Sequence, residues 1–194
     1  MKTYTIIAGA NGVGKTSLYQ ILKNYDDLGE RINVDEIVSL SGSWMDKLLQ
    51  IKASRSALSM ANKCIAKGIT FHQETTLPGN VIAKQIKKAR AEGFTVRLYF
   101  IGVESVDIAL SRVGKRVRKC GHGIDENTVR KRFEAMPKSL EGILSLCDTA
   151  SFYDNTLRFR RIALTRGNVI YDCDVDVPGW FSALEAQGII VEGK

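Results

Sequence analysis

The segment at residues 9–16, with the sequence Gly-Ala-Asn-Gly-Val-Gly-Lys-Thr, constrains this chain more than any other feature. It fits the pattern G-x-x-x-x-G-K-[ST], in which glycines let the backbone wrap around a phosphate group. The preceding residues 3–8 are rich in β-branched and aromatic side chains, and residues 14–22 have a helical pattern. A loop between a strand and a helix directs backbone N–H groups and the helix N-terminus at negative charge. The sequence therefore predicts a phosphate-binding loop.

The side chains of this loop predict separate roles in binding a nucleotide. Lys15 would reach the β- and γ-phosphates of ATP, and the Thr16 hydroxyl would hold Mg²⁺ as the metal ligand. The predicted cofactors are therefore ATP and Mg²⁺. The predicted nucleotide-binding residues are Gly9, Asn11, Gly12, Val13, Gly14, Lys15, Thr16 and Ser17. A glycine-rich turn with no ligand is the alternative.

The rest of the chain alternates between strand and helix patterns. Strands are predicted at 3–8, 31–34, 69–73, 95–101 and 151–154, with a terminal hairpin at 161–165 and 169–172. Helices are predicted at 44–67 between a Ser43 cap and Gly68, and at 80–92, 106–119, 126–146 and 180–187. This order predicts an α/β fold of the P-loop NTPase type: a mostly parallel five-stranded sheet flanked by helices, with a C-terminal β-hairpin. A length of 194 residues fits one domain over 1–194.

The composition limits which cellular compartment and which binding partners we expect for this chain. The N-terminus has no signal-peptide pattern, and no apolar run reaches membrane-spanning length, so we expect a cytoplasmic protein with no membrane partner. Four scattered cysteines and two histidines do not complete a zinc-ligand spacing. The net charge of +7 favours an anionic partner such as ATP, a nucleotide-sugar, RNA or DNA, although a merely solvated basic surface would show the same charge.

Acidic and hydroxyl side chains follow two of the predicted strands, at the edge of the sheet where the phosphate loop lies. Asp35 could act as a general base that takes a proton from an acceptor hydroxyl. A metal ligand and a helix cap are the other interpretations of Asp35. Glu74, Thr75 and Thr76 are assigned to substrate binding, with helix capping as the alternative.

One face of the predicted helix at 106–119 is strongly cationic, because four basic residues recur at helical spacing. They are Arg112, Lys115, Arg116 and Lys119. Such a face could close over a transferring phosphoryl group and neutralise its charge, with Arg112 and Arg116 as the catalytic candidates. His122, between two glycines after this helix, is a candidate substrate contact in a mobile lid. A solvated basic face and an incidental loop histidine are the alternatives.

Taken together, six segments resemble the zeta-toxin-like family of P-loop kinases. They are 9–16, 33–36, 74–79, 111–117, 121–125 and 153–155, and their order and spacing match over about residues 3 to 156, so that the C-terminal hairpin lies outside. The resemblance is most specific at 74–79 and at the arginine helix, because a phosphate loop alone occurs in many families.

The resemblance implies a nucleoside-kinase-like fold, ATP as phosphoryl donor and, as in the toxins proper, a UDP-N-acetyl sugar as acceptor. It would make Asp35 the base, Lys15 and Arg112 phosphate stabilisers, and Glu74 a contact to the substrate. It also makes an antitoxin protein a candidate partner. The chain differs from the toxins proper in its Glu-Thr-Thr segment at 74–76 and in having His122 where they tend to have a lid arginine.

The leading hypothesis is an ATP-dependent kinase that phosphorylates a hydroxyl of an anionic small molecule. Two rivals are kept. A nucleic-acid-directed P-loop protein is suggested by the charge of +7, although few aromatic residues interleave the basic run. An ABC-type ATPase is suggested by the loop sequence and by Leu-Ser-Gly-Ser at 40–43, although this segment lies too close to Lys15 for that family's signature.

Overall fold

The computed structural model describes residues 1–41, 46–77, 79–118 and 123–193. Its strands are β1 (Thr3–Ala8), β2 (Glu30–Asn33), β3 (Phe71–Thr75), β4 (Thr95–Gly102), β5 (Thr149–Asp154), β6 (Arg160–Arg166), β7 (Val169–Cys173) and β8 (Val191–Glu192). Its helices are α1 (Lys15–Leu22), α2 (Val34–Ser41), α3 (Lys47–Lys67), α4 (Val81–Ala91), α5 (Val106–Arg118), α6 (Glu126–Glu134), α7 (Met136–Leu144) and α8 (Gly179–Ala186).

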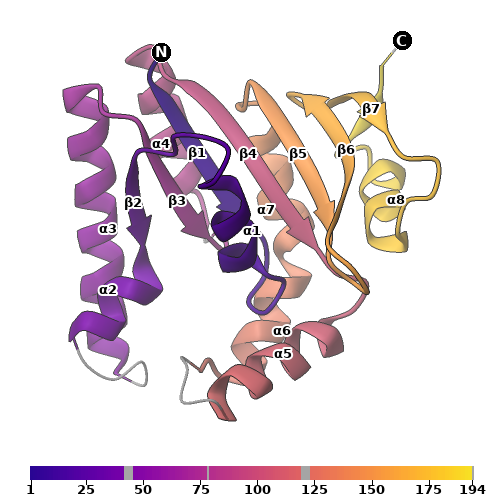
Figure 1. Cartoon of the computed structure of the whole chain (residues 1–194), viewed down its shortest axis with the longest axis horizontal. Helices are drawn as coiled ribbons and strands as arrows, with labels where there is room; N and C mark the ends of the chain where they lie inside the picture. The colour runs from indigo at the N-terminus through magenta and orange to yellow at the C-terminus, as the bar shows by residue number, and fades with distance from the viewer. Residues whose placement is uncertain (42–45, 78, 119–122, 194) are drawn as a thin grey trace.

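The described strands form one sheet in the order β2-β3-β1-β4-β5-β6-β7-β8. The first five strands of that order are all parallel, so the predicted α/β fold with a five-stranded parallel core is confirmed. In Figure 1, α1 lies in front of the sheet, whereas α4 and α7 lie behind it. The helices α2, α5 and α6 gather below the sheet, where the parallel strands end. That edge is where parallel α/β sheets form their binding sites.

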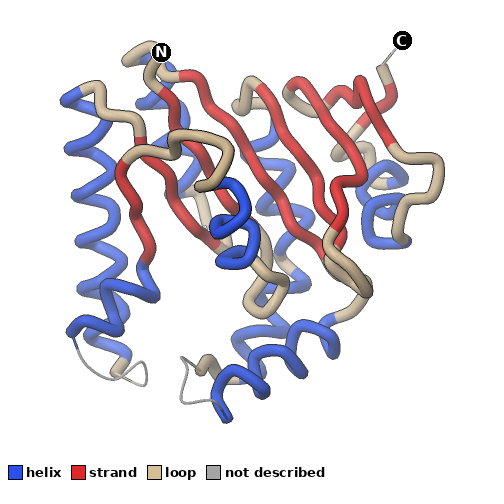
Figure 2. The backbone as a smooth tube through the Cα atoms, viewed as in Figure 1, coloured by secondary structure: helices blue, strands red, loops and turns tan. Residues whose placement is uncertain are grey.

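The C-terminal hairpin continues the same sheet. Strand β7 pairs antiparallel with β6, which confirms the predicted hairpin. Strand β6 also pairs antiparallel with β5. The two-residue strand β8, which was not predicted from the sequence, pairs parallel with β7. Figure 2 shows these strands beside the parallel core, with α8 next to them.

The central strand β1 is buried along its whole length because it lies between β3 and β4 with helices on both faces. The ring of Tyr4 stacks on Phe71 with centroids 4.3 Å apart, and its hydroxyl donates to Gln73 Oε1 at 2.8 Å. A buried tyrosine needs such a partner for its hydroxyl. This packing fixes the strand that carries the phosphate loop.

The start of α3 differs from the prediction. The helix begins at Lys47, and the Asp46 carboxylate caps it by accepting hydrogen bonds from the backbone N–H groups of Leu48 and Leu49 at 2.8 and 3.1 Å. Ser43 and Trp44, where the prediction placed the cap and the start, lie outside the described residues. The predicted end is confirmed, because Gly68 adopts the left-handed conformation with φ of 67°.

Two further differences from the prediction concern a helix that is divided in two and a helix that was not predicted. The predicted helix at 126–146 is two helices, α6 and α7, because Pro137 in the first turn of α7 has no N–H and its ring clashes with the carbonyl four residues earlier. Helix α2 begins at Val34, directly after β2, where only the end of a strand was predicted. In the described part of the chain, no helix is both long and apolar enough to span a bilayer.

Candidate active site

The phosphate loop connects β1 to α1, and its glycines allow an approach to neighbouring backbone that side chains would prevent. Gly12 has φ of 84°, and a Cβ atom there would lie 2.3 Å from the carbonyl oxygen of Ala109 in α5. Gly14 has φ of 109°, and a Cβ atom there would lie 2.6 Å from Asn155 Nδ2. These conformations and contacts require glycine at both positions. The loop is therefore packed against α5 and against the segment after β5.

Two side chains from distant parts of the chain hold the loop in place. Asn155 Nδ2 donates to the backbone carbonyl of Val13 at 2.8 Å, and Arg132 Nη1 donates to Asn11 Oδ1 at 3.1 Å. The Val13 side chain is buried, and both Asn11 and Val13 thus support the loop from the protein side. Thr16 and Ser17, in contrast, are exposed at the start of α1.

Lys15 folds back onto its own loop. Its Nζ donates to the backbone carbonyls of Gly9 and Ala10, both at 2.9 Å. Burial lowers the pKa of Lys15 to about 8, an effect opposed by the nearby carboxylates of Asp35 and Glu74. The cations Arg116 and Arg132 lower it further. An anion placed at the loop would favour the charged form of Lys15, which makes the loop receptive to phosphate.

This pKa predicts that ATP binding weakens in alkaline solution. The charged form of Lys15 attracts phosphate, and its population in the free protein falls as pH rises through about 8. Between pH 7.5 and 9.5 we expect the affinity for ATP, measured by calorimetry, to fall by roughly tenfold. A Lys15→Arg variant should show weaker but nearly constant affinity, because arginine does not titrate in this range. Parallel pH profiles of the two proteins would contradict the prediction.

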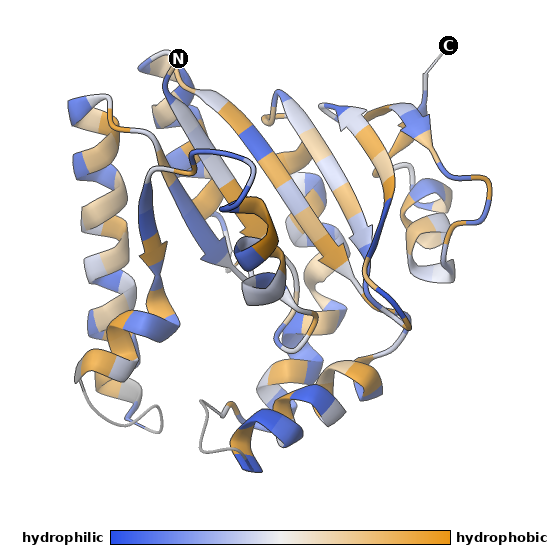
Figure 3. Ribbon diagram, viewed as in Figure 1, coloured by the Kyte–Doolittle hydropathy of each residue, from blue (hydrophilic) through white to orange (hydrophobic). Residues whose placement is uncertain are grey.

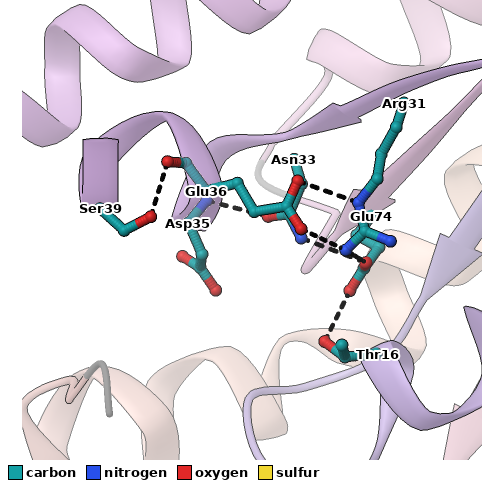
Figure 4. Close-up of polar contacts among 7 residues, drawn as sticks. All are labelled: Thr16, Arg31, Asn33, Asp35, Glu36, Ser39 and Glu74. Atoms are coloured by element: carbon teal, nitrogen blue, oxygen red, sulfur yellow. Dashed lines mark hydrogen bonds and ion pairs between the residues drawn. The ribbon is translucent and has the colours of Figure 1, made fainter. Parts of the chain in front are cut away.

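Glu74, at the end of β3, lies at the centre of a polar cluster, as Figure 4 shows. Its Oε2 accepts from Thr16 Oγ1 at 3.1 Å, and its Oε1 accepts from Arg31 Nη2 at 2.8 Å and from Asn33 Nδ2 at 3.1 Å. Burial raises the pKa of Glu74, while Arg31 and Lys15 act in the opposite direction. The cluster connects the phosphate loop to the ends of β2 and β3.

Arg31 was not among the predicted site residues, although it organises this cluster. Its guanidinium group lies 3.5 Å from the ring centroid of Tyr19 and also pairs with Glu36 at 2.6 Å. Tyr19 in turn stacks on the buried ring of His72, with centroids 5.0 Å apart. A lone arginine in a strand pattern carries no local signal of such a role.

Asp35 lies in the first turn of α2, and the helix is capped by a different residue. The Asp35 backbone N–H donates to Asn33 Oδ1 at 2.9 Å, so Asn33 supplies the capping oxygen and the capping interpretation of Asp35 is wrong. In Figure 4 the Asp35 carboxylate points away from Glu74, on the side of Thr16. Within the described residues no hydrogen bond to this carboxylate is present, which leaves it available to a ligand.

The two threonines after Glu74 differ from each other. Thr75 Oγ1 accepts a hydrogen bond from the Leu77 backbone N–H at 3.0 Å, which supports a turn in which Leu77 has φ of 53°. Thr75 thus has a structural contact through its hydroxyl oxygen, while its O–H proton can still be donated. Helix α4 has Asn80 at its N-cap, so capping does not explain Thr76. His122 lies outside the described residues.

The cationic helix α5 lies next to the loop and is amphipathic, with hydrophilic and hydrophobic residues on different sides (Figure 3). Arg112 Nη2 donates to the backbone carbonyl of Thr156 at 3.2 Å. Its Nη1 is buried and has no hydrogen-bond partner among the described residues. Arg116 is exposed one turn later and lowers the pKa of Lys15, and Lys115 is also exposed. A buried donor without a partner is costly, which favours an anionic ligand for Arg112.

A hydrogen-bonded network from α8 supports the segment that holds Arg112. Trp180 Nε1 donates to Asp154 Oδ1 at 3.0 Å, and the same oxygen accepts from Thr156 Oγ1 at 2.7 Å. Thr156 Oγ1 also accepts from the backbone N–H of Glu104 at 3.0 Å. This contact could not be predicted from the sequence, because Trp180 lies in a helix remote in sequence from Asp154.

We expect Trp180→Phe to lower the free energy of unfolding by about 2 kcal/mol, since a hydrogen bond to a buried carboxylate is lost together with part of the packing of the indole ring. Urea denaturation measures this change. Tyr171→Phe is the matched control, because it removes only the hydroxyl group from an aromatic side chain that is 53% exposed, and it should change the free energy little. Equal effects of the two substitutions would contradict the assignment.

Comparison with known proteins relates this arrangement to one family. The sequence model of the zeta toxin family matches residues 1–176. The match extends beyond residue 156, so the expectation that the C-terminal hairpin lies outside the resemblance is wrong, since β6 and β7 fall within it. An uncharacterized protein of Haemophilus influenzae is 36% identical over 125 residues, which cover 64% of this chain and 88% of that protein.

Solved structures share the fold at low sequence identity. A structure of the PezAT chromosomal toxin-antitoxin system of Streptococcus pneumoniae has a TM-score of 0.59 and 14% identity, and the match covers 79% of this chain and 69% of that chain. The structure of AvrRxo1-ORF1:-ORF2 with ATP has a TM-score of 0.64 and 14% identity, over 100% of this chain and 66% of that chain. At such identities these similarities concern the fold alone.

Proposed function

This chain belongs to the zeta toxin family, and we propose that it uses Mg·ATP to phosphorylate a hydroxyl group of a small molecule. The observation that supports this proposal most is the position of Asp35. Its carboxylate lies across from Thr16, at the edge of the sheet where the loop containing Lys15 also ends. A carboxylate facing a phosphate loop suits proton removal from an acceptor beside the transferred group.

The residues of the site have separate roles in the proposed reaction. The loop N–H groups and Lys15 bind the β- and γ-phosphates, and Arg112 and Arg116 neutralise charge on the transferred group. Asp35 takes the proton of the acceptor hydroxyl while the acceptor oxygen forms its bond to the γ-phosphorus and the bond from that phosphorus to the β-phosphate oxygen breaks. ADP and the phosphorylated acceptor are the products.

The residues around Thr16 also fit a magnesium ion. Thr16 Oγ1 and the adjacent Glu74 carboxylate are hard oxygen donors of the type that Mg²⁺ prefers, and Thr16 is the residue of the loop that would hold it. Bound there, Mg²⁺ would neutralise charge on the phosphates. Within the described ranges, no cluster of three or more histidine, cysteine or acidic side chains suited to a metal occurs.

The acceptor class and the protein partner that we propose rest on the resemblance to the family. We propose a UDP-N-acetyl sugar or a related nucleotide as acceptor, since the net charge of +7 suits an anionic substrate. The proposed substrate contacts remain Thr76, Glu74, Thr75 and His122. Of these, Glu74 and Thr75 also accept hydrogen bonds from other residues of the protein. The PezAT structure concerns a toxin-antitoxin system, so an antitoxin is the protein partner we propose. The family match favours this kinase over an ABC-type ATPase.

A screen with γ-labelled ATP tests the proposal. Nucleotide-sugars, nucleosides, simple sugars and RNA would each be incubated with the protein, Mg²⁺ and labelled ATP. We expect label to appear in a small molecule, most strongly in a nucleotide-sugar. Labelled RNA with no labelled small molecule would replace the proposed function with the nucleic-acid-directed alternative.

A further inference from the structure

The positive charge of the chain is concentrated in two helices. Residues 47–67 and 81–91, which form α3 and α4, contain nine of the 28 basic residues and none of the 21 acidic residues. Because the net charge of the whole chain is +7, the remaining residues together have a net charge of −2. The excess of positive charge is therefore carried by α3 and α4, in addition to the cations near the phosphate loop.

The two helices contact each other, and α3 has one side turned towards the protein. Lys88 Nζ of α4 donates to Asn62 Oδ1 of α3 at 3.0 Å. Ala53, Ala57 and Ala61 are buried, and their spacing of four residues places them on one side of α3. In Figure 1, α3 lies beside β2 and α4 lies behind the sheet, whereas α1, which follows the phosphate loop, lies in front.

The opposite side of α3 carries an exposed apolar stripe. Leu48, Ile51 and Leu58 are 70%, 50% and 37% exposed. With Arg55 and Asn62 they follow one another at intervals of three and four residues, the spacing of the positions a and d through which two helices pack. Arg55, Leu58 and Asn62 also border a shallow depression on the surface of α3. The stripe thus has the pattern that contacts a second helix.

Exposed basic side chains lie around this stripe. They are Lys52, Arg55 and Lys63 of α3 and Lys84 and Lys88 of α4. Among the residues that the structure describes, none of these five forms a salt bridge. Their charges are therefore available to a partner with acidic residues.

The combination of apolar and basic residues selects the class of partner. The phosphates of a nucleic acid would pair with the cations, but they would gain nothing from the apolar stripe. Neither helix contains an aromatic residue on which an unpaired base could stack. An amphipathic helix with acidic residues beside its apolar positions complements both features.

We propose that the stripe of Leu48, Ile51, Arg55, Leu58 and Asn62, with the adjacent lysines of α4, is a docking site for an acidic amphipathic helix of a partner protein. The partner helix places apolar residues against the stripe and Asp or Glu residues opposite the cations. This proposal is independent of the proposed kinase function, because no residue of the docking site belongs to the phosphate loop or to the polar cluster of the active site.

A synthetic peptide of about three heptads, the length of α3, serves as the probe. It has Leu at positions a and d and Glu at positions e and g, so that repulsion between the Glu residues prevents its self-association. A comparison peptide has Lys in place of Glu. Fluorescence anisotropy measures the affinity of the protein for each labelled peptide. We expect the acidic peptide to bind at least about tenfold more tightly than the basic one.

Two variants test the apolar and the basic parts of the site separately. We expect Ile51→Ser and Arg55→Glu each to weaken binding of the acidic peptide by about tenfold, through loss of an apolar contact and reversal of a charge. Val175→Ser and Lys138→Glu are the matched controls, because both side chains are exposed outside α3 and α4, and they should keep the wild-type affinity. Circular dichroism checks that each variant is folded.

Three results would overturn the proposal. Equal affinities for the acidic and the basic peptide would show that the cations do not select the partner. Wild-type affinity for the acidic peptide in folded Ile51→Ser or folded Arg55→Glu would show that the peptide binds elsewhere. Duplex RNA that binds more tightly than the acidic peptide, with this affinity lost in Arg55→Glu and kept in Ile51→Ser, would assign the surface to nucleic acid.

Discussion

Phosphoryl transfer is expected to fall by about 10²-fold or more in a Lys15→Ala variant, because Lys15 supplies the cation that the loop itself directs at the β- and γ-phosphates. The fold should survive. Lys15 makes hydrogen bonds to the carbonyls of Gly9 and Ala10, but burial already disfavours its charge, so its removal costs the folded state little. Turnover of labelled ATP and a thermal unfolding curve measure the two quantities.

Lys87→Ala is the matched control for this variant. Lys87 is exposed on α4, behind the sheet, and the same substitution there removes one positive charge from the protein without touching the loop. We expect it to keep wild-type transfer. Unchanged transfer in a folded Lys15→Ala protein would refute the assignment of the phosphate loop itself.

Asp35→Asn is expected to lower transfer by about 10²-fold or more while leaving the affinity for Mg·ATP nearly unchanged. The amide has the size of the carboxylate and can still accept a hydrogen bond, but it cannot take the proton of the acceptor hydroxyl. The position of Asp35 on α2, apart from the contact between Thr16 and Glu74, agrees with a role on the acceptor instead of the nucleotide. Calorimetry across a magnesium titration, together with transfer assays, measures both effects.

Asp176→Asn serves as control, because its side chain is 99% exposed on the segment after β7 and it carries the same chemical change. If Asp35→Asn instead weakens Mg·ATP binding and added Mg²⁺ restores it, Asp35 is a metal ligand and the base assignment fails. Full transfer activity in the variant would exclude both roles.

The phosphate loop could be predicted from the sequence because its geometry is local. Eight consecutive residues carry the glycines, Lys15 and Thr16, and the flanking strand and helix patterns place the loop at the correct edge of the sheet. Asp35 and Glu74 could be predicted to face the crevice for the same reason, since each lies at or just after the end of a parallel strand.

The supporting contacts could not be predicted, because they join residues that are far apart in the chain. Arg132 meets Asn11 across 121 residues, and Asn155 meets Val13 across 142. Arg31 and Trp180 have ordinary positions in a strand and a helix, and only the folded sheet brings Arg31 to Glu74 and Trp180 to Asp154. Local patterns carry no information on such pairs.

The errors in helix boundaries have a different cause, because local signals for a helix start can lie close together. The prediction used Ser43 as the cap of the helix at 44–67, whereas Asp46, three residues later, is also a good capping residue and caps α3. Pro137 was a visible break within the predicted helix at 126–146, but the apolar periodicity continues through it. Both errors concern boundaries, and neither changes the edge of the sheet where the site lies.

The most direct test of the proposed kinase activity is to measure where the γ-phosphate of ATP is found after the reaction. Labelled ATP would be incubated with the protein, Mg²⁺ and the acceptor that the screen identifies, and ADP, free phosphate and phosphorylated acceptor would be measured together. We expect one phosphorylated acceptor for each ADP formed, with little free phosphate and with both products lost in Lys15→Ala. ADP formed at the same rate without acceptor, accompanied by an equal amount of free phosphate, would identify an ATPase and contradict the account.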